Sequence, residues 1–312
     1  MKKVLCMILA LVLLACPGCK APEQPGGETG GTASFTYTNL DSEDAQGEVR
    51  NSLTEAGIRE EYVDTVLGWA VDYNSCMREC EAFSLAGDFV PMEGTTVDYG
   101  EYYPMMTEWY RKQGRDYSDI LCRVAAFALV RDMVSVEKVL EKEAFDCWDE
   151  NHSWLFSDGD IFFGREAVEG EHKAFPPSPL IASWDEDMVA EYFTLFEPLP
   201  VNTEYDEEEM VQAIQDKWRE QGISFQEGSY SLITFWRQNS GKMAVSHAAV
   251  LAETGEGYLL FEKTNPLSPY AATRFSSTAE VKQYLYDMMA LDCARYDSPV
   301  GTYVILQNGR PL

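Results

Sequence analysis

Two short segments, far apart in the chain, carry side chains that could act as a nucleophile and its base. Residues 118–123 read SDILCR at the start of an apolar helical stretch, and residues 246–251 read SHAAVL at the start of a predicted strand. A cysteine near a helix N-terminus lies where the helix dipole favours the thiolate, which is the reactive form. A histidine held by a neighbouring strand could take the proton and return it. The pattern therefore predicts a cysteine hydrolase with Cys122 as nucleophile and His247 as base.

The hairpin that follows His247 decides which side chain could orient the imidazole. Its two strands are joined by the sequence TGEG at 254–257. If the turn is centred on Thr254–Gly255 or on Gly255–Glu256, Glu262 lies on the same face of the hairpin as His247, because side chains alternate along a strand. A turn shifted by one residue would leave Lys263 there instead. Asn265, just beyond the strand, is the alternative orienting residue.

Attack on a carbonyl also needs donors for the oxyanion that forms. The backbone N–H of Cys122 is one candidate, and Gln113 and Tyr117 are the nearest upstream side chains. The competing interpretation is structural, since a buried cysteine behaves as a small apolar residue and this helix is apolar nearly all round. The other two histidines, His152 and His172, lie in loop-like segments where solvation accounts for them.

The N-terminus has the features of an export signal. Lys2 and Lys3 precede an apolar run at 4–14, which has the length of a signal-peptide core and is too short to span a bilayer. The run ends in LLAC, similar to the bacterial lipobox, so we expect cleavage before Cys16 and acylation of Cys16. Cys19 is a poorer match, and the alternative is plain secretion with an unlipidated thiol.

The expected domain organisation is a signal peptide at 1–15, a tether at 16–34 and a single large domain at 35–312. The tether is rich in Gly, Pro, Glu and Thr and has almost no large apolar residue, so it cannot bury enough surface to fold. Within the domain, the region around 150–225 is interpreted as an insertion, because it contains two loop-like stretches, at 157–179 and at 198–209. The mature protein would be anchored to the outer face of a bacterial membrane.

The chain is strongly acidic, with 52 Asp and Glu residues against 24 Lys and Arg and a net charge of −28. A field of this sign repels nucleic acid and anionic polymers, so nucleic acid is excluded as a partner. Membrane lipid at acylated Cys16 and a neutral or cationic peptide-like substrate are the expected partners. The alternative is that the acidity only keeps an exported protein soluble.

Helical patterns fill the first half of the domain, and strand patterns fill the second. The apolar spacing predicts helices over 41–56, 60–83, 119–140, 184–196, 208–221 and 278–290. Strands are predicted over 231–237, 243–253, 258–263 and 301–307. Because helices precede an antiparallel sheet, the predicted fold class is α+β, with N-terminal helices packed on a C-terminal sheet.

The remaining cysteines and acidic residues predict little further chemistry. Outside the cytoplasm, Cys76, Cys80, Cys147 and Cys293 could pair in three ways, and their spacing does not choose among them. The SDGD sequence at 157–160 has carboxylates but lacks the EF-hand ligand pattern, so we interpret it as a solvated turn. No metal and no cofactor are expected.

Six short motifs together resemble a known family. They are YTNL at 37–40, CR at 122–123, SHAAV at 246–250, FEK at 261–263, PY at 269–270 and RF at 274–275. Over most of the mature chain they resemble an uncharacterised bacterial lipoprotein family, domain of unknown function 4300, which implies no known activity.

The helix-borne cysteine and the strand that begins with histidine are similar, in addition, to NlpC-type and papain-like thiol hydrolases. Members of those families cleave amides in peptides, cell-wall stem peptides or acyl groups. Cys122 matches their nucleophile and His247 their base, which implies a papain-like or NlpC-like arrangement. The segment between the two residues is longer than in compact NlpC domains, although papain-like folds tolerate such insertions.

The expected function is that of an exported lipoprotein that hydrolyses amide bonds with a site made of Cys122, His247 and Glu262 or Asn265. The alternative is a non-catalytic surface lipoprotein that binds a ligand or a protein partner on a hydrolase-like fold. A solute binder of a transporter is disfavoured, because the helices-then-sheet order lacks the strand–helix alternation of two doubly wound lobes.

Overall fold

The computed structural model describes residues 35–78, 84–99, 117–141, 155–166, 174–239, 241–264 and 267–312. All of them belong to the unit Ala33–Leu312. Several residues named in the predictions lie outside the described residues, namely Cys16, Cys19, Cys80, Gln113, Cys147, His152, His172 and Asn265.

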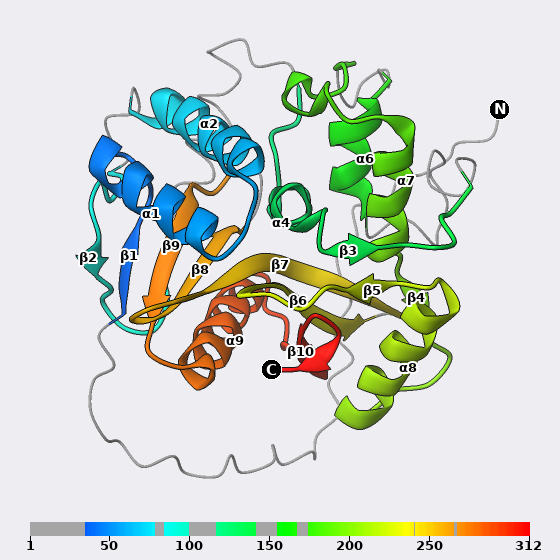
Figure 1. Ribbon diagram of the computed structural model, residues 1–312. Coiled ribbons are helices and arrows are strands. Elements are labelled where there is room, and N and C mark those ends of the chain that lie inside the picture. Colours follow the sequence, from blue (N-terminus) through cyan, green and yellow to red (C-terminus); the bar gives the residue numbers. More distant parts are fainter. Residues whose placement is uncertain are drawn as a thin grey trace, which may run out of the picture. The chain divides into compact units, whose positions relative to one another are not determined.

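Helices dominate the first part of the chain and strands the last (Figure 1). The helices are α1 (Glu43–Glu55), α2 (Glu60–Met77), α4 (Cys122–Val130), α6 (Phe156–Phe163), α7 (Glu186–Leu195), α8 (Glu207–Glu220) and α9 (Thr278–Arg295), with a 3-10 turn at Pro179–Ile181. The strands are β1 (Thr36–Thr38), β2 (Val90–Pro91), β3 (Val134–Ser135), β4 (Leu199–Pro200), β5 (Ser224–Phe225), β6 (Tyr230–Asn239), β7 (Lys242–Thr254), β8 (Gly257–Lys263), β9 (Tyr270–Phe275), β10 (Tyr303–Gln307) and β11 (Arg310–Pro311).

The main sheet has the strand order β11-β10-β6-β7-β8-β9-β1-β2, and its neighbouring strands pair in antiparallel fashion. Strand β4 pairs with β7 outside this path, and β3 and β5 form a separate small sheet. The predicted class is confirmed: the fold is α+β, with N-terminal helices against a mostly antiparallel C-terminal sheet. Strand β1 next to β9 was not predicted, because three residues are too few to show a strand period.

The sheet separates two buried apolar clusters, because the side chains of each strand point alternately to its two faces. Val250 of β7 belongs to the cluster that contains Phe127 of α4, and the next residue, Leu251, belongs to the cluster that contains Leu285 of α9. Figure 1 accordingly shows α4 and α9 on opposite sides of β7. All residues of α4 are buried, as expected for a helix that is apolar nearly all round.

Two predicted segments differ from the structure. The helix predicted over 119–140 is only the nine-residue α4, which ends at Val130, because a turn there leads into β3 and its pairing with β5. The stretch 157–179, predicted as a loop, contains α6, and its SDGD sequence is helical rather than a solvated turn. Burial of Ile161 and Phe162 against the core outweighs the glycine that suggested a turn. None of the described helices is long and apolar enough to cross a membrane.

Candidate active site

Cys122 is the first residue of α4. The residue before it, Leu121, caps the helix in an extended conformation without a side-chain hydrogen bond, so the first N–H groups of α4 keep their positive potential. The thiol is buried, with 4% of the residue exposed. The sequence thus places a nucleophilic atom at the positive end of a helix inside the protein.

His247 lies on β7 at a β-bulge. Phe235 of β6 pairs with His247, but the next residue of β6, Trp236, pairs with Val245, so Ser246 is an extra residue. A bulge bends its strand and changes the direction in which the neighbouring side chains point. The buried imidazole is therefore aimed by a local irregularity that alternation alone would not predict.

Glu262 reaches the imidazole from β8. The hairpin register pairs Ala249 with Glu262, which corresponds to the second of the two turns that the sequence allowed. Nε2 of His247 donates a hydrogen bond to Oε2 of Glu262 over 2.6 Å, and the hydroxyl of Tyr284 on α9 donates to the other carboxylate oxygen. Both oxygens of this buried carboxylate thus have a partner, which fixes its orientation.

The imidazole of His247 interacts with both the thiol of Cys122 and the carboxylate of Glu262. Because Nε2–H is bound to Glu262, Nδ1 is the ring nitrogen left for the thiol, and it makes no hydrogen bond of ordinary geometry with any described group. The thiol of Cys122 and the imidazole nevertheless lie close enough to act on each other's pKa. Cys122 of α4, His247 of β7, Glu262 of β8 and Tyr284 of α9 therefore form one continuous buried array.

Burial and the neighbouring groups act on the pKa values of this array in opposite directions. Burial raises the pKa of the Cys122 thiol, but the interaction with His247, the charge of Arg123 and the backbone N–H of Ala248 outweigh it, and the net pKa is lowered. Burial lowers the pKa of His247, but its interactions with Cys122 and Glu262 raise it to about 10. Together the two shifts favour a thiolate–imidazolium pair over a neutral pair.

A second buried cluster surrounds Arg123, the residue after the cysteine. Its Nε donates to Oδ1 of Asp158 on α6 over 3.0 Å, its Nη2 is paired with Oδ2, and its Nη1 donates to the carbonyl of Val245 over 2.7 Å. The hydroxyl of Tyr192 on α7 donates to the same carboxylate. Asp158 is fully buried, so the guanidinium charge at the site is balanced inside the protein.

Lys263 points to the side of the sheet opposite Glu262. Its Nζ lies 3.8 Å from a carboxylate oxygen of Asp119 and 3.8 Å and 4.6 Å from the ring centroids of Tyr73 and Tyr270. The turn that would have brought Lys263 to the face of His247 is therefore not the one found.

Of the predicted site residues, the structure brings Cys122, His247 and Glu262 together. Tyr117 is half-buried on the segment before α4, while Gln113 and Asn265 lie outside the described residues. Arg123, Asp158, Tyr192 and Tyr284 also belong to the site and were not predicted from the sequence. The charge of Arg123 within an apolar helix could have indicated a buried acidic partner, since buried charges are paired.

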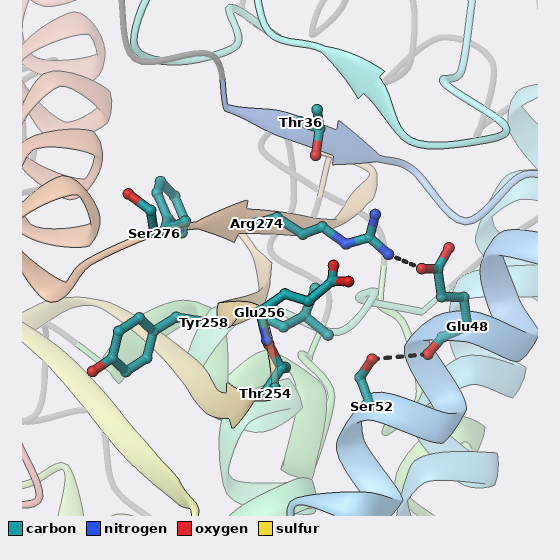
Figure 2. A pocket seen from close by; sticks show the side chains of 11 residues that line it. Thr36, Glu48, Ser52, Thr254, Glu256, Tyr258, Arg274 and Ser276 are labelled. Atoms are coloured by element: carbon teal, nitrogen blue, oxygen red, sulfur yellow. Dashed lines mark hydrogen bonds and ion pairs between the residues drawn. The ribbon is translucent and has the colours of Figure 1, made fainter.

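Two cavities lined by described residues lie away from the array, since neither of these two is lined by Cys122, His247 or Glu262. One, of about 380 Å³, lies between α1 and the β7–β8 hairpin, where Arg274 reaches Glu48 (Figure 2). The other, of about 400 Å³, lies between α8 and β10. Within the described part of the chain, no three His, Cys, Asp or Glu side chains are grouped so that they could hold a metal ion.

Comparison with known families agrees with the motifs in the sequence. The family named domain of unknown function (DUF4300) matches residues 36–312. The chain belongs to this family. No curated protein and no solved structure matches it. The DUF4300 match runs from β1 to the C-terminus, so the entire array around Cys122 lies within the family domain.

Proposed function

We propose that this DUF4300 protein is an exported lipoprotein that hydrolyses amide bonds, with Cys122 as nucleophile and His247 as acid and base. The observation that carries the proposal is the buried array of Cys122, His247 and Glu262, in which the thiol pKa is lowered and the imidazole pKa is raised to about 10. A thiolate and an imidazolium are the two species that the first step of cysteine hydrolysis needs.

In the first half of the reaction, the thiolate of Cys122 attacks the amide carbonyl carbon and forms a C–S bond. The electron pair of the C=O bond moves to the oxygen. When the tetrahedral intermediate collapses, the C–N bond breaks and His247 gives its proton to the leaving nitrogen. In the second half, neutral His247 removes a proton from water, which attacks the thioester, and the carboxylic acid leaves as Cys122 becomes a thiolate again.

The oxyanion would be met by the backbone N–H of Cys122, which lies in the first turn of α4 and is left without an intrahelical acceptor. Tyr117 and Gln113 are the proposed upstream donors. Glu262 keeps Nε2 protonated, and Tyr284 holds Glu262 in place. Asn265 is the proposed alternative orienting residue, beyond the end of β8.

The proposed location and substrate class rest on the sequence. The LLAC match supports cleavage before Cys16, acylation of Cys16 and attachment to the outer face of a bacterial membrane through the tether. The net charge of −28 supports a neutral or cationic peptide-like substrate, such as a peptide, a cell-wall stem peptide or an acyl amide. Mass spectrometry of the native N-terminus should find acylated Cys16, and unmodified Cys16 or acylated Cys19 would contradict this part.

One observation favours a second function, that of a non-catalytic binding lipoprotein. Cys122 is only 4% exposed, and the cavity between α1 and the β7–β8 hairpin and the cavity between α8 and β10 are both lined by other residues. The papain-like or NlpC-like arrangement would then be a scaffold for binding without chemistry.

Peptide cleavage separates the two functions. The lipoprotein purified in detergent is incubated with a library of neutral and cationic peptides, and the products are identified by mass spectrometry. We expect cleavage by the wild type and by Cys293→Ala, which removes a second buried thiol on α9, but none by Cys122→Ser. Peptides bound but not cleaved by the wild type would favour the binding function, and cleavage that persists in Cys122→Ser would refute Cys122 as nucleophile.

A further inference from the structure

We propose that Arg123 is a positioning residue for the Cys122–His247 pair, which it acts on by joining the start of α4 to the bulge of β7. This inference rests on the proposed function, because it concerns the residue that prepares the same thiol for reaction. Arg123 then has two separable effects. The hydrogen bonds of its planar, forked guanidinium set the geometry of the Cys122–His247 pair, and its positive charge stabilises the thiolate.

Nη1 of Arg123 donates a hydrogen bond to the carbonyl oxygen of Val245 over 2.7 Å. Val245 comes directly before the extra residue Ser246, and the next position is His247. A bulge interrupts the ladder of backbone hydrogen bonds, so a side-chain donor there holds the bulge in one shape. The residue adjacent to the nucleophile thus fixes the backbone that aims the base.

The carboxylate of Asp158 holds the other two nitrogens of the guanidinium. Asp158 receives Nε at 3.0 Å and pairs with Nη2, and Tyr192 donates to the same carboxylate. Since this pairing is bidentate, the plane of the guanidinium is fixed, and with it the direction of Nη1. Four elements, α4, α6, α7 and β7, are therefore joined through the Arg123–Asp158 pair.

Several ionisable side chains surround the thiol of Cys122. Arg123 from α4, His247 from β7 and Tyr192 from α7 interact with Cys122 electrostatically, with Asp158 of α6 behind Arg123 and Glu262 of β8 behind His247. Arg123 and an imidazolium are the cations in this set. A lysine at position 123 would keep the charge but could not reproduce the planar fork.

The experiment measures how fast Cys122 of the full-length protein reacts with iodoacetamide between pH 5 and pH 10, by peptide mapping. If the fork positions the pair, Arg123→Lys moves the midpoint of the pH–rate profile of Cys122 upward by about one unit, which slows alkylation by about tenfold at pH values below that midpoint. Arg123→Met, which also lacks the charge, slows it further. Tyr192→Phe removes one donor to Asp158, keeps the ring packing, and gives a smaller change in the same direction.

The matched control is Arg165→Lys, because Arg165 makes a bidentate ion pair with Asp160, which lies on the same helix as Asp158. It should alkylate as the wild type does. Near-UV circular dichroism and the thermal midpoint show which variants are folded, and Tyr192→Phe gives a second measurement if Arg123→Met does not fold.

Two outcomes are distinguishable. An unshifted pH profile in folded Arg123→Lys and Tyr192→Phe would overturn the positioning role while leaving the thiolate–imidazolium pair intact. An ordinary thiol pKa in the wild type itself would overturn the proposed function, and this inference with it.

Discussion

Two arginine–carboxylate pairs of this protein lie in opposite environments. Arg123 and Asp158 are buried beside the candidate nucleophile, whereas Arg274 and Glu48 have side chains 37% and 49% exposed at the cavity of Figure 2. The buried pair has a third partner and a backbone acceptor at a bulge, while the guanidinium of Arg274 lies 3.7 Å over the ring of Phe89. Burying an ion pair costs desolvation free energy, and we propose that the effect of Arg123 on Cys122 is the reason why this protein buries one. The exposed pair keeps its contact with solvent and has no comparable cost to offset.

The largest effect of a substitution is expected when the buried pair is broken. Asp158→Asn leaves the guanidinium of Arg123 without a counter-charge in the interior, so the free energy of unfolding should fall by about 3–5 kcal/mol. Denaturant unfolding followed by fluorescence measures it. If Asp158→Asn costs less than about 1 kcal/mol, Arg123 is not held as the structure shows.

The pH dependence of stability tests the buried array next. The pKa of His247 is raised in the folded state to about 10, against a value near 6.5 in the unfolded chain, so its contribution is fully present below about pH 6.5 and is lost as the pH rises through 10. The wild type should therefore lose more stability between pH 7 and pH 10.5 than His247→Gln does. Parallel curves for the two proteins would show that His247 is not charged in the folded state.

The smallest effect is expected at the exposed pair. Glu48→Gln should change the free energy of unfolding by at most about 1 kcal/mol, and by less in high salt, because solvent screens the interaction with Arg274. The same unfolding experiment measures it. A loss as large as that of Asp158→Asn would remove the distinction between the two pairs.

The parts of the site that local patterns determine could be predicted from the sequence. The cysteine at a helix start follows from the apolar run after Cys122, and the face of Glu262 follows from strand alternation and a glycine turn. The α+β class follows from the order of helical and strand patterns. Each of these inferences needs only residues that are near each other in the chain.

The remaining parts depend on contacts between distant segments. Arg123 in an apolar helix could have indicated a buried acid, but nothing local shows which of the 52 acidic residues is its partner, and Asp158 in an SDGD sequence suggested a turn. The hydroxyl of Tyr284 reaches Glu262 from α9, which packs in the apolar cluster on the face of the sheet opposite α4. The bulge at Ser246 arises from the pairing of β7 with β6, which a single strand pattern does not reveal.

The most direct test of the central claim is the pH at which Cys122 becomes reactive in the folded, reduced lipoprotein. Iodoacetamide labelling and peptide mapping compare Cys122 with Cys293, a buried thiol on α9, in the wild type and in His247→Gln. A thiolate–imidazolium pair predicts that Cys122 is labelled at pH 6, faster than Cys293, and that His247→Gln loses this advantage. Equal inertness of both thiols at pH 6, or the same rate with and without His247, would contradict it.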